Sequence, residues 1–159
     1  ALWVEFMAGK PGRFEFLEQP LPVGEEAAMA RLAADSGVAI ALDESLNGPV
    51  GTRWLAPGAW SGPLVIKPLL MGDLGTLREQ LRPVAGQLVF SSVFETAVGL
   101  HQVVALLATL PPIHWAAGFD TLDAFDDGLS APSAGPKLVP AQILGQDLDQ
   151  LWNQLPATN

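Results

Sequence analysis

Four stretches decide the fold: Phe16-Leu17-Glu18, Ala41-Leu42-Asp43, Val65-Ile66-Lys67 and Val89-Phe90-Ser91. Each is a short apolar run that ends in a residue whose side chain can bind a ligand or take part in catalysis. These end residues lie 25, 24 and 24 positions apart. Such an interval holds one strand and one returning helix, and its repetition builds a parallel sheet. Because the carboxyl ends of successive parallel strands meet at one mouth, where barrel enzymes keep their chemistry, the spacing predicts a shared active site.

The rest of the chain fits alternating strands and helices. Expected strands cover residues 14–17, 38–42, 64–66, 88–90 and 116–119, and expected helices cover 25–36, 73–82 and 97–110. Gly37 and Pro83 are typical helix stops, and Asp73 is a typical helix cap. The Gly- and Pro-rich segment 49–60 interrupts the repeat and is expected to hold at most a short helix. The pattern indicates the α/β class.

The length indicates part of a barrel. A complete barrel of this type needs about 250 residues, whereas this chain has 159. Its first seven residues have helix-like apolar spacing with no cap before them. We therefore expect residues 1–159 to be a fragment, the carboxyl-terminal part of one barrel domain. A closing strand at 137–139 and a helix at 146–155 would end the barrel.

Composition excludes several classes of partner. The net charge is −9, and the eight lysines and arginines are scattered, which argues against nucleic acid. No cysteine is present, so disulfides and thiolate metal sites are excluded. The longest apolar stretch, Val103 to Leu110, is too short to span a bilayer, so we expect no membrane partner. A cytoplasmic location is the default expectation.

The strand-end residues suggest metal chemistry. The carboxylates of Glu18 and Asp43 are hard oxygen ligands of the kind that Mg²⁺ prefers. Lys67 on the next strand could transfer a proton or stabilise an anion beside the cation. Taken singly, strand-end carboxylates more often cap helices or face solvent, but the equal spacing of the set favours a joint site.

Other polar residues are better explained structurally. His101 and His114 are isolated, so a zinc site is not indicated. The acidic residues Asp120, Asp123, Asp126 and Asp127 lack the spacing and turn glycine of a calcium loop. We interpret that segment as a solvated loop.

Five motifs carry a family resemblance: Phe16-Leu17-Glu18-Gln19-Pro20, Ala41-Leu42-Asp43-Glu44-Ser45, Val65-Ile66-Lys67-Pro68, Phe90-Ser91-Ser92-Val93-Phe94-Glu95 and Gly118-Phe119-Asp120-Thr121-Leu122-Asp123. The chain resembles the carboxyl-terminal part of enolase-superfamily enzymes, and within them the o-succinylbenzoate synthase family of menaquinone and phylloquinone biosynthesis. The resemblance implies a partial TIM-type (β/α)7β barrel without its amino-terminal capping domain and first strands. The first three motifs are shared across the superfamily, and the last two favour the synthase family.

The resemblance also implies roles. Glu18 and Asp43 would be Mg²⁺ ligands, and Lys67 the catalytic lysine on the far side of the substrate from the base. Pocket-lining residues for the substrate's succinyl carboxylate would be Ser91, Ser92 and Gly118. Glu44 would orient Lys67 or Asp43 from behind.

The implied reaction is dehydration. A cyclohexadiene carboxylate that bears a hydroxyl and a succinyl group would lose water through an enediolate, giving the aromatic product o-succinylbenzoate. Superfamily sites combine a Lys or His base with Mg²⁺. Because aromatisation makes this step easy, Lys67 could act as a fixed cation without transferring a proton.

The chain departs from the family pattern before Glu18. The family carries a Lys-x-Lys pair that includes the base and an aspartate ligand there, whereas this chain has only Lys10 and no aspartate. We expect the remaining barrel and the capping domain to be partners and the chain alone to be inactive. The open alternatives are an N-acylamino acid racemase, a dipeptide epimerase, a muconate-type cycloisomerase, or a non-catalytic half-barrel.

Overall fold

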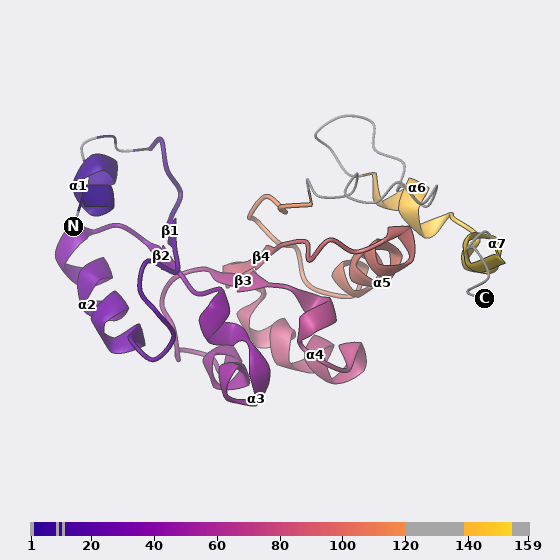
Figure 1. Cartoon of the computed structure of the whole chain (residues 1–159), viewed down its shortest axis with the longest axis horizontal. Helices are drawn as coiled ribbons and strands as arrows, with labels where there is room; N and C mark the ends of the chain where they lie inside the picture. Colours follow the sequence, from indigo (N-terminus) through magenta and orange to yellow (C-terminus); the bar gives the residue numbers. More distant parts are fainter. Residues whose placement is uncertain (1, 9, 11, 120–138, 154–159) are drawn as a thin grey trace, which may run out of the picture.

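Short parallel strands form one continuous series in the structure, a computed structural model that describes residues 2–8, 10, 12–119 and 139–153. Strand β1 (Leu17–Glu18) pairs with β2 (Ile40–Ala41), and β3 (Leu64–Ile66) pairs with β4 (Leu88–Phe90). Parallel bridges from Leu42 to Leu64 and from Ser91 to Gly118 join the two pairs and extend the series. All these strand pairings and bridges are parallel, as the repeat predicted. Figure 1 shows the successive strands and their helices side by side along the long axis of the molecule.

Helices return the chain between the strands. The α-helices are α1 (Leu2–Ala8), α2 (Glu26–Ser36), α3 (Gly48–Gly51), α4 (Leu74–Leu81), α5 (Ala97–Ala108), α6 (Pro140–Leu144) and α7 (Leu148–Asn153). Short 3-10 helices are η1 (Glu44–Leu46), η2 (Thr52–Leu55), η3 (Pro68–Leu70) and η4 (Arg82–Gln87).

The helix boundaries follow the predicted local signals. Gly37 ends α2 with a φ of 69°, which a residue with a side chain seldom adopts. The Asp73 carboxylate caps α4 by accepting a hydrogen bond from the N–H of Thr76. The predicted irregular segment 49–60 holds only short helices, α3 and η2, because its glycines and prolines suit tight turns better than a long helix.

Two boundary predictions need correction, and a third lies mostly outside the described residues. The strand expected at 116–119 is a single bridge at Gly118. The helix expected at 146–155 starts later, at Leu148, and α6 precedes it with Pro140 at its first position, a signal that the sequence analysis missed. The strand expected at 137–139 falls mostly outside the described residues, as do the acidic residues 120–127, and Val139 caps α6.

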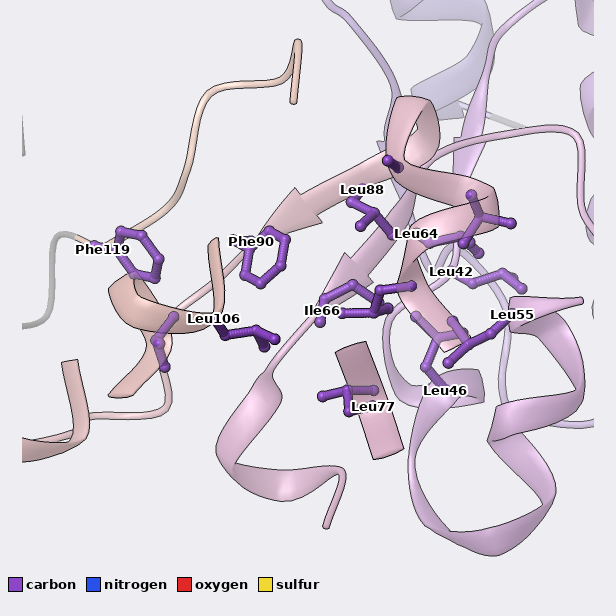
Figure 2. Packing of buried hydrophobic residues seen from close by; sticks show 14 of the residues in the cluster. Leu42, Leu46, Leu55, Leu64, Ile66, Leu77, Leu88, Phe90, Leu106 and Phe119 are labelled. Atoms are coloured by element: carbon purple, nitrogen blue, oxygen red, sulfur yellow. The ribbon is translucent and has the colours of Figure 1, made fainter. Parts of the chain in front are cut away.

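The main core lies between the strands and the helices that return them. It takes alternate strand residues, and Figure 2 shows Leu42, Leu64, Ile66, Leu88 and Phe90 meeting side chains from η1, η2, α4 and α5. A second, smaller cluster on the opposite strand face consists of Ala41, Val65 and Val89, with Phe16 and Trp115 packed against it. The two clusters follow from the two-residue period of a strand.

None of the helices that the structure describes is long and apolar enough to cross a membrane.

Candidate active site

The predicted site residues share the face of the smaller cluster. Glu18, Asp43, Lys67 and Ser91 lie two residues beyond Phe16, Ala41, Val65 and Val89, respectively. Side chains two apart on a strand point to the same side, so all four stand above this cluster at the carboxyl ends of the strands. This face of the sheet thus carries apolar residues along the strands and polar residues at their carboxyl ends, which is the arrangement that barrel enzymes use.

An ion pair joins the second and third strand ends. The Lys67 ammonium donates a short hydrogen bond to Oδ2 of Asp43. The Asp43 side chain is 4% exposed and the Lys67 side chain 22% exposed. An ion pair with one member this deeply buried is screened less by water than a surface pair. The structure therefore brings these two predicted residues together.

Glu18 completes a cluster of charges. Partial burial is the largest cause that raises the pKa of its carboxyl, and the neighbouring Asp43 carboxylate raises it further by repulsion and hydrogen bonding. Lys67 opposes these effects by lowering the pKa, while Glu44 adds a small rise. Two carboxylates this close repel each other when both are ionised. A cation bound between them would remove that repulsion, so the pair favours cation binding.

The donor set fits a divalent cation such as Mg²⁺. Oδ1 of Asp43 is buried and accepts no hydrogen bond from the described residues, and Glu18 lies beside it. A buried carboxylate oxygen without a donor is costly unless it meets a cation or water. No group of three or more His, Cys, Asp or Glu suited to a metal occurs among the described residues. A pair of carboxylates is a usual protein contribution to Mg²⁺, with water and substrate supplying the rest.

Ser91 and Gly118 lie side by side at the far end of the mouth. The N–H of Gly118 donates to the carbonyl of Phe90, and the carbonyl of Gly118 accepts from the N–H of Ser92. A methyl group at Gly118 would stand 3.7 Å from Oγ of Ser91. The glycine therefore leaves the space beside this hydroxyl open.

Ser92 and Glu44 have surroundings that sequence reasoning did not anticipate. Ser92 is buried, and its hydroxyl accepts a hydrogen bond from the N–H of Phe94 within the turn. Glu44 is exposed and acts on Glu18 through its charge, and no hydrogen bond to Lys67 or Asp43 is found for it among the described residues. Their predicted roles toward substrate and lysine stay predictions.

Sequence reasoning gave no site role to two further polar residues. Gln19 bridges the ends of β1 and β2 through its side chain. Glu95 is 6% exposed and accepts from the N–H of Val93, which fixes the turn after Ser91 and Ser92. Both residues lie within motifs that were quoted for the residues beside them. Membership of those motifs was the sequence signal that could have identified them.

Comparisons with known proteins show what the chain as a whole is similar to. No family model matches the chain. It is 42% identical over 113 residues to o-succinylbenzoate synthase of Thermosynechococcus vestitus, an alignment that covers 68% of this chain and 34% of that protein. It is 34% identical over 143 residues to o-succinylbenzoate synthase of Aliivibrio salmonicida, covering 88% and 42%. The chain thus spans roughly a third to two fifths of the length of these relatives.

Solved structures give the same picture. Crystalline o-succinylbenzoate synthase from Thermosynechococcus elongatus, complexed with Mg in its active site, superimposes with a TM-score of 0.64 at 38% identity, over 77% of this chain and 38% of that one. A mandelate racemase/muconate lactonizing protein from Herpetosiphon aurantiacus gives 0.60 at 24% identity, over 76% and 34%, which supports the fold alone. Over the aligned residues, the chain is homologous to a part of o-succinylbenzoate synthases.

Proposed function

We propose that this chain supplies half of the active site of an Mg²⁺-dependent dehydratase of the o-succinylbenzoate synthase type. Its substrate would be the succinyl-hydroxy-cyclohexadiene carboxylate, and its product o-succinylbenzoate. The observation that supports this most is the cluster of Glu18, Asp43 and Lys67 at three successive strand ends. Similarity to o-succinylbenzoate synthase over 68% of this chain supports this reaction.

Glu18 and Asp43 would hold the cation. The buried, unpaired Oδ1 of Asp43 and the crowded carboxyl of Glu18 both gain from positive charge placed between them. When bound, Mg²⁺ supplies the charge that stabilises the oxygens of an enediolate, which is prohibitively uphill in water.

Lys67 would act on the substrate as a fixed cation. Its hydrogen bond to Asp43 holds the ammonium at the mouth, on the face that the carboxylates share. Dehydration to an aromatic ring needs a single proton abstraction, so an electrostatic partner suffices opposite the base. Ser91, Ser92 and Gly118 would receive the succinyl carboxylate, and Glu44 would tune the cluster through its charge.

The base and the remaining ligand would come from outside residues 1–159. Lys10 is the only lysine before Glu18, and the described structure gives it a place over the ring of Phe6, 3.6 Å from the ring centre, on the loop after α1. We infer that the parent enzyme provides a Lys-x-Lys pair, an aspartate ligand and a capping domain, and that 1–159 is the carboxyl-terminal part of its barrel. A cytoplasmic location accords with that chemistry.

Two substitutions in the parent enzyme test the role of Lys67. Lys67→Arg keeps the charge and should retain part of the dehydration, whereas Lys67→Ala should lose far more. In a racemase both faces of the carbon need an acid-base group, so Arg and Ala would be equally inactive. Because the longer guanidinium can also fail for lack of space, the substrate test described next decides between the two.

The wild-type parent enzyme is then assayed on the cyclohexadiene and, in deuterated water, on N-acylamino acids and dipeptides. Turnover of the cyclohexadiene without α-deuterium exchange is expected. Rapid exchange with racemisation, and no dehydration, would reject the synthase assignment in favour of a racemase or epimerase.

A further inference from the structure

The Gln19 side chain uses its full hydrogen-bonding capacity. Its Oε1 accepts from the main-chain N–H groups of Asp43, at 2.9 Å, and Ser45, at 3.4 Å. Its Nε2 donates to the carbonyl of Leu21, at 3.0 Å, and to Oγ of Ser45, at 2.9 Å. A primary amide offers two donors and an acceptor oxygen with two lone pairs, so only this group meets all four partners without a charge.

One of these bonds continues the ladder between β1 and β2. The N–H of Leu17 donates to Ala39 and that of Gln19 to Ala41, so the next bond of a parallel ladder would run from the N–H of Asp43 to the main-chain carbonyl of Gln19. Gln19 has a φ of 35°, in the left-handed region, and its backbone turns away from the strand. Its side-chain carbonyl accepts the bond instead.

A buried carboxylate supports the amide from behind. Oγ of Ser45 donates to Oε1 of Glu26 at 2.7 Å, and the N–H of Gly24 donates to the same oxygen at 3.1 Å. Glu26 is 4% exposed, and Arg53 approaches its other oxygen at 3.9 Å. The chain of bonds therefore runs from the end of β1 through η1 to the start of α2, with a charged group at its end.

We propose that Gln19 is a positioning residue that sets the Glu18 and Asp43 carboxylates at the separation a divalent cation requires. Glu18 directly precedes Gln19, and the N–H of Asp43 is bonded to the Gln19 side chain, so the two ligand-bearing residues move together. The inference rests on the proposed metal site. Groups that orient metal ligands typically change metal affinity by about 10–100-fold when they are removed.

The experiment measures Mn²⁺ binding to the 159-residue chain by electron paramagnetic resonance, with Mn²⁺ as a spectroscopic probe for a hard oxygen site. Because two carboxylates leave the ion most of its waters, the wild type should bind in about the millimolar range. Gln19→Met should weaken binding about tenfold or more, and Ser45→Ala by a smaller factor. The matched control is Gln80→Met, an exposed glutamine on α4, which should bind like the wild type.

Hydrogen exchange provides the structural arm. In Gln19→Met the amides of Asp43 and Ser45 should exchange faster, while the capped amide of Thr76 should not change. Faster exchange with unchanged Mn²⁺ affinity would make the network merely structural and overturn the inference, leaving the proposed function intact. Unchanged exchange would overturn it too.

Two remaining outcomes also decide the matter. If Gln19→Met does not fold, Ser45→Ala carries the test, and wild-type affinity in that variant rejects the positioning role. If the wild-type chain binds no Mn²⁺ at all, the metal site fails and the inference fails with it, so the two kinds of failure are distinguishable.

Discussion

The two faces of the strand series differ in how well this chain covers them. We call the face of the main core the outer face, and the face of the Ala41, Val65 and Val89 cluster the inner face. On the outer face, strand residues such as Leu64 and Phe90 are at most 1% exposed and pack into a large cluster with the helices. On the inner face, three small residues form the buried cluster, and Phe16 and Trp115 cover it from opposite ends of the series with their rings 5.5 Å apart. The outer face thus carries a large buried core, whereas the inner face carries only a small buried cluster below the strand ends.

This difference indicates that the outer face contributes most of the stability and that the proposed chemistry belongs to the inner face. Helices that return every strand complete the outer face within the chain itself, because each repeat brings its own covering helix. The inner face depends on all strands at once, because barrel interiors are filled by layers from many strands. We therefore expect the outer core to form within this chain, and the proposed site on the inner face to need groups from further strands.

The largest expected effect concerns the inner face. The chain alone should show no measurable dehydration, because loss of a general base typically costs about 10²–10⁴-fold and loss of a metal ligand adds to this. The measurement follows conversion of the cyclohexadiene to the aromatic product by purified residues 1–159. A rate near that of a full-length synthase would mean that the inner face is complete as it stands.

A pair of core truncations compares the faces directly. Phe90→Ala on the outer face should lower the free energy of unfolding by about 3–5 kcal/mol. Val65→Ala on the inner face removes two methyl groups and should cost about 1–2 kcal/mol, at roughly 0.8 kcal/mol per carbon. Both residues are buried in strands. Urea denaturation gives the two values, and equal losses would contradict the division into a large and a small core.

Two glycines extend the comparison to the backbone. A methyl at Gly62 would lie 2.0 Å from the carbonyl oxygen of Ile40, which also accepts the indole N–H of Trp60, so Gly62→Ala should cost about 1–3 kcal/mol through strain. Gly118 is exposed and has ordinary space for a methyl, so Gly118→Ala should stay within about 0.5 kcal/mol of the wild type. Thermal unfolding of both variants checks this. A larger loss at Gly118 would show that the inner face tolerates less than its open space indicates.

Sequence reasoning could predict the strand ends but not the contacts beyond them. The period of the apolar runs located the ends at Glu18, Asp43, Lys67 and Ser91, because strand spacing and side-chain alternation are properties of the chain itself. The bridging role of Gln19 depends on a left-handed backbone and on the register of a neighbouring strand, which no local pattern encodes. For the same reason the strand at 116–119 could not be told from a bridge. By contrast, α6 carries a local signal, Pro140 at its first position, which sequence reasoning overlooked.

The smallest expected effect lies at Glu26, the first residue of α2. Burial raises the pKa of this carboxyl, but hydrogen bonds from the N–H of Gly24 and the hydroxyl of Ser45, with the charge of Arg53, outweigh burial and leave the pKa below its ordinary value of 4.5. A lowered folded-state pKa contributes stability that is present above pH 4.5 and is lost as the pH falls through the folded-state value. Urea denaturation of the wild type from pH 6 to pH 3 should therefore show declining stability below about pH 4.5, and Glu26→Gln should decline less steeply because it has no carboxylate to protonate.

Asp73→Asn serves as the matched control, since the Asp73 carboxylate is exposed and its pKa is lowered mainly by the N–H of Thr76. If Glu26→Gln and the wild type lose stability in parallel while Asp73→Asn alone flattens the curve, the helix cap and not the buried network is the acid-sensitive element.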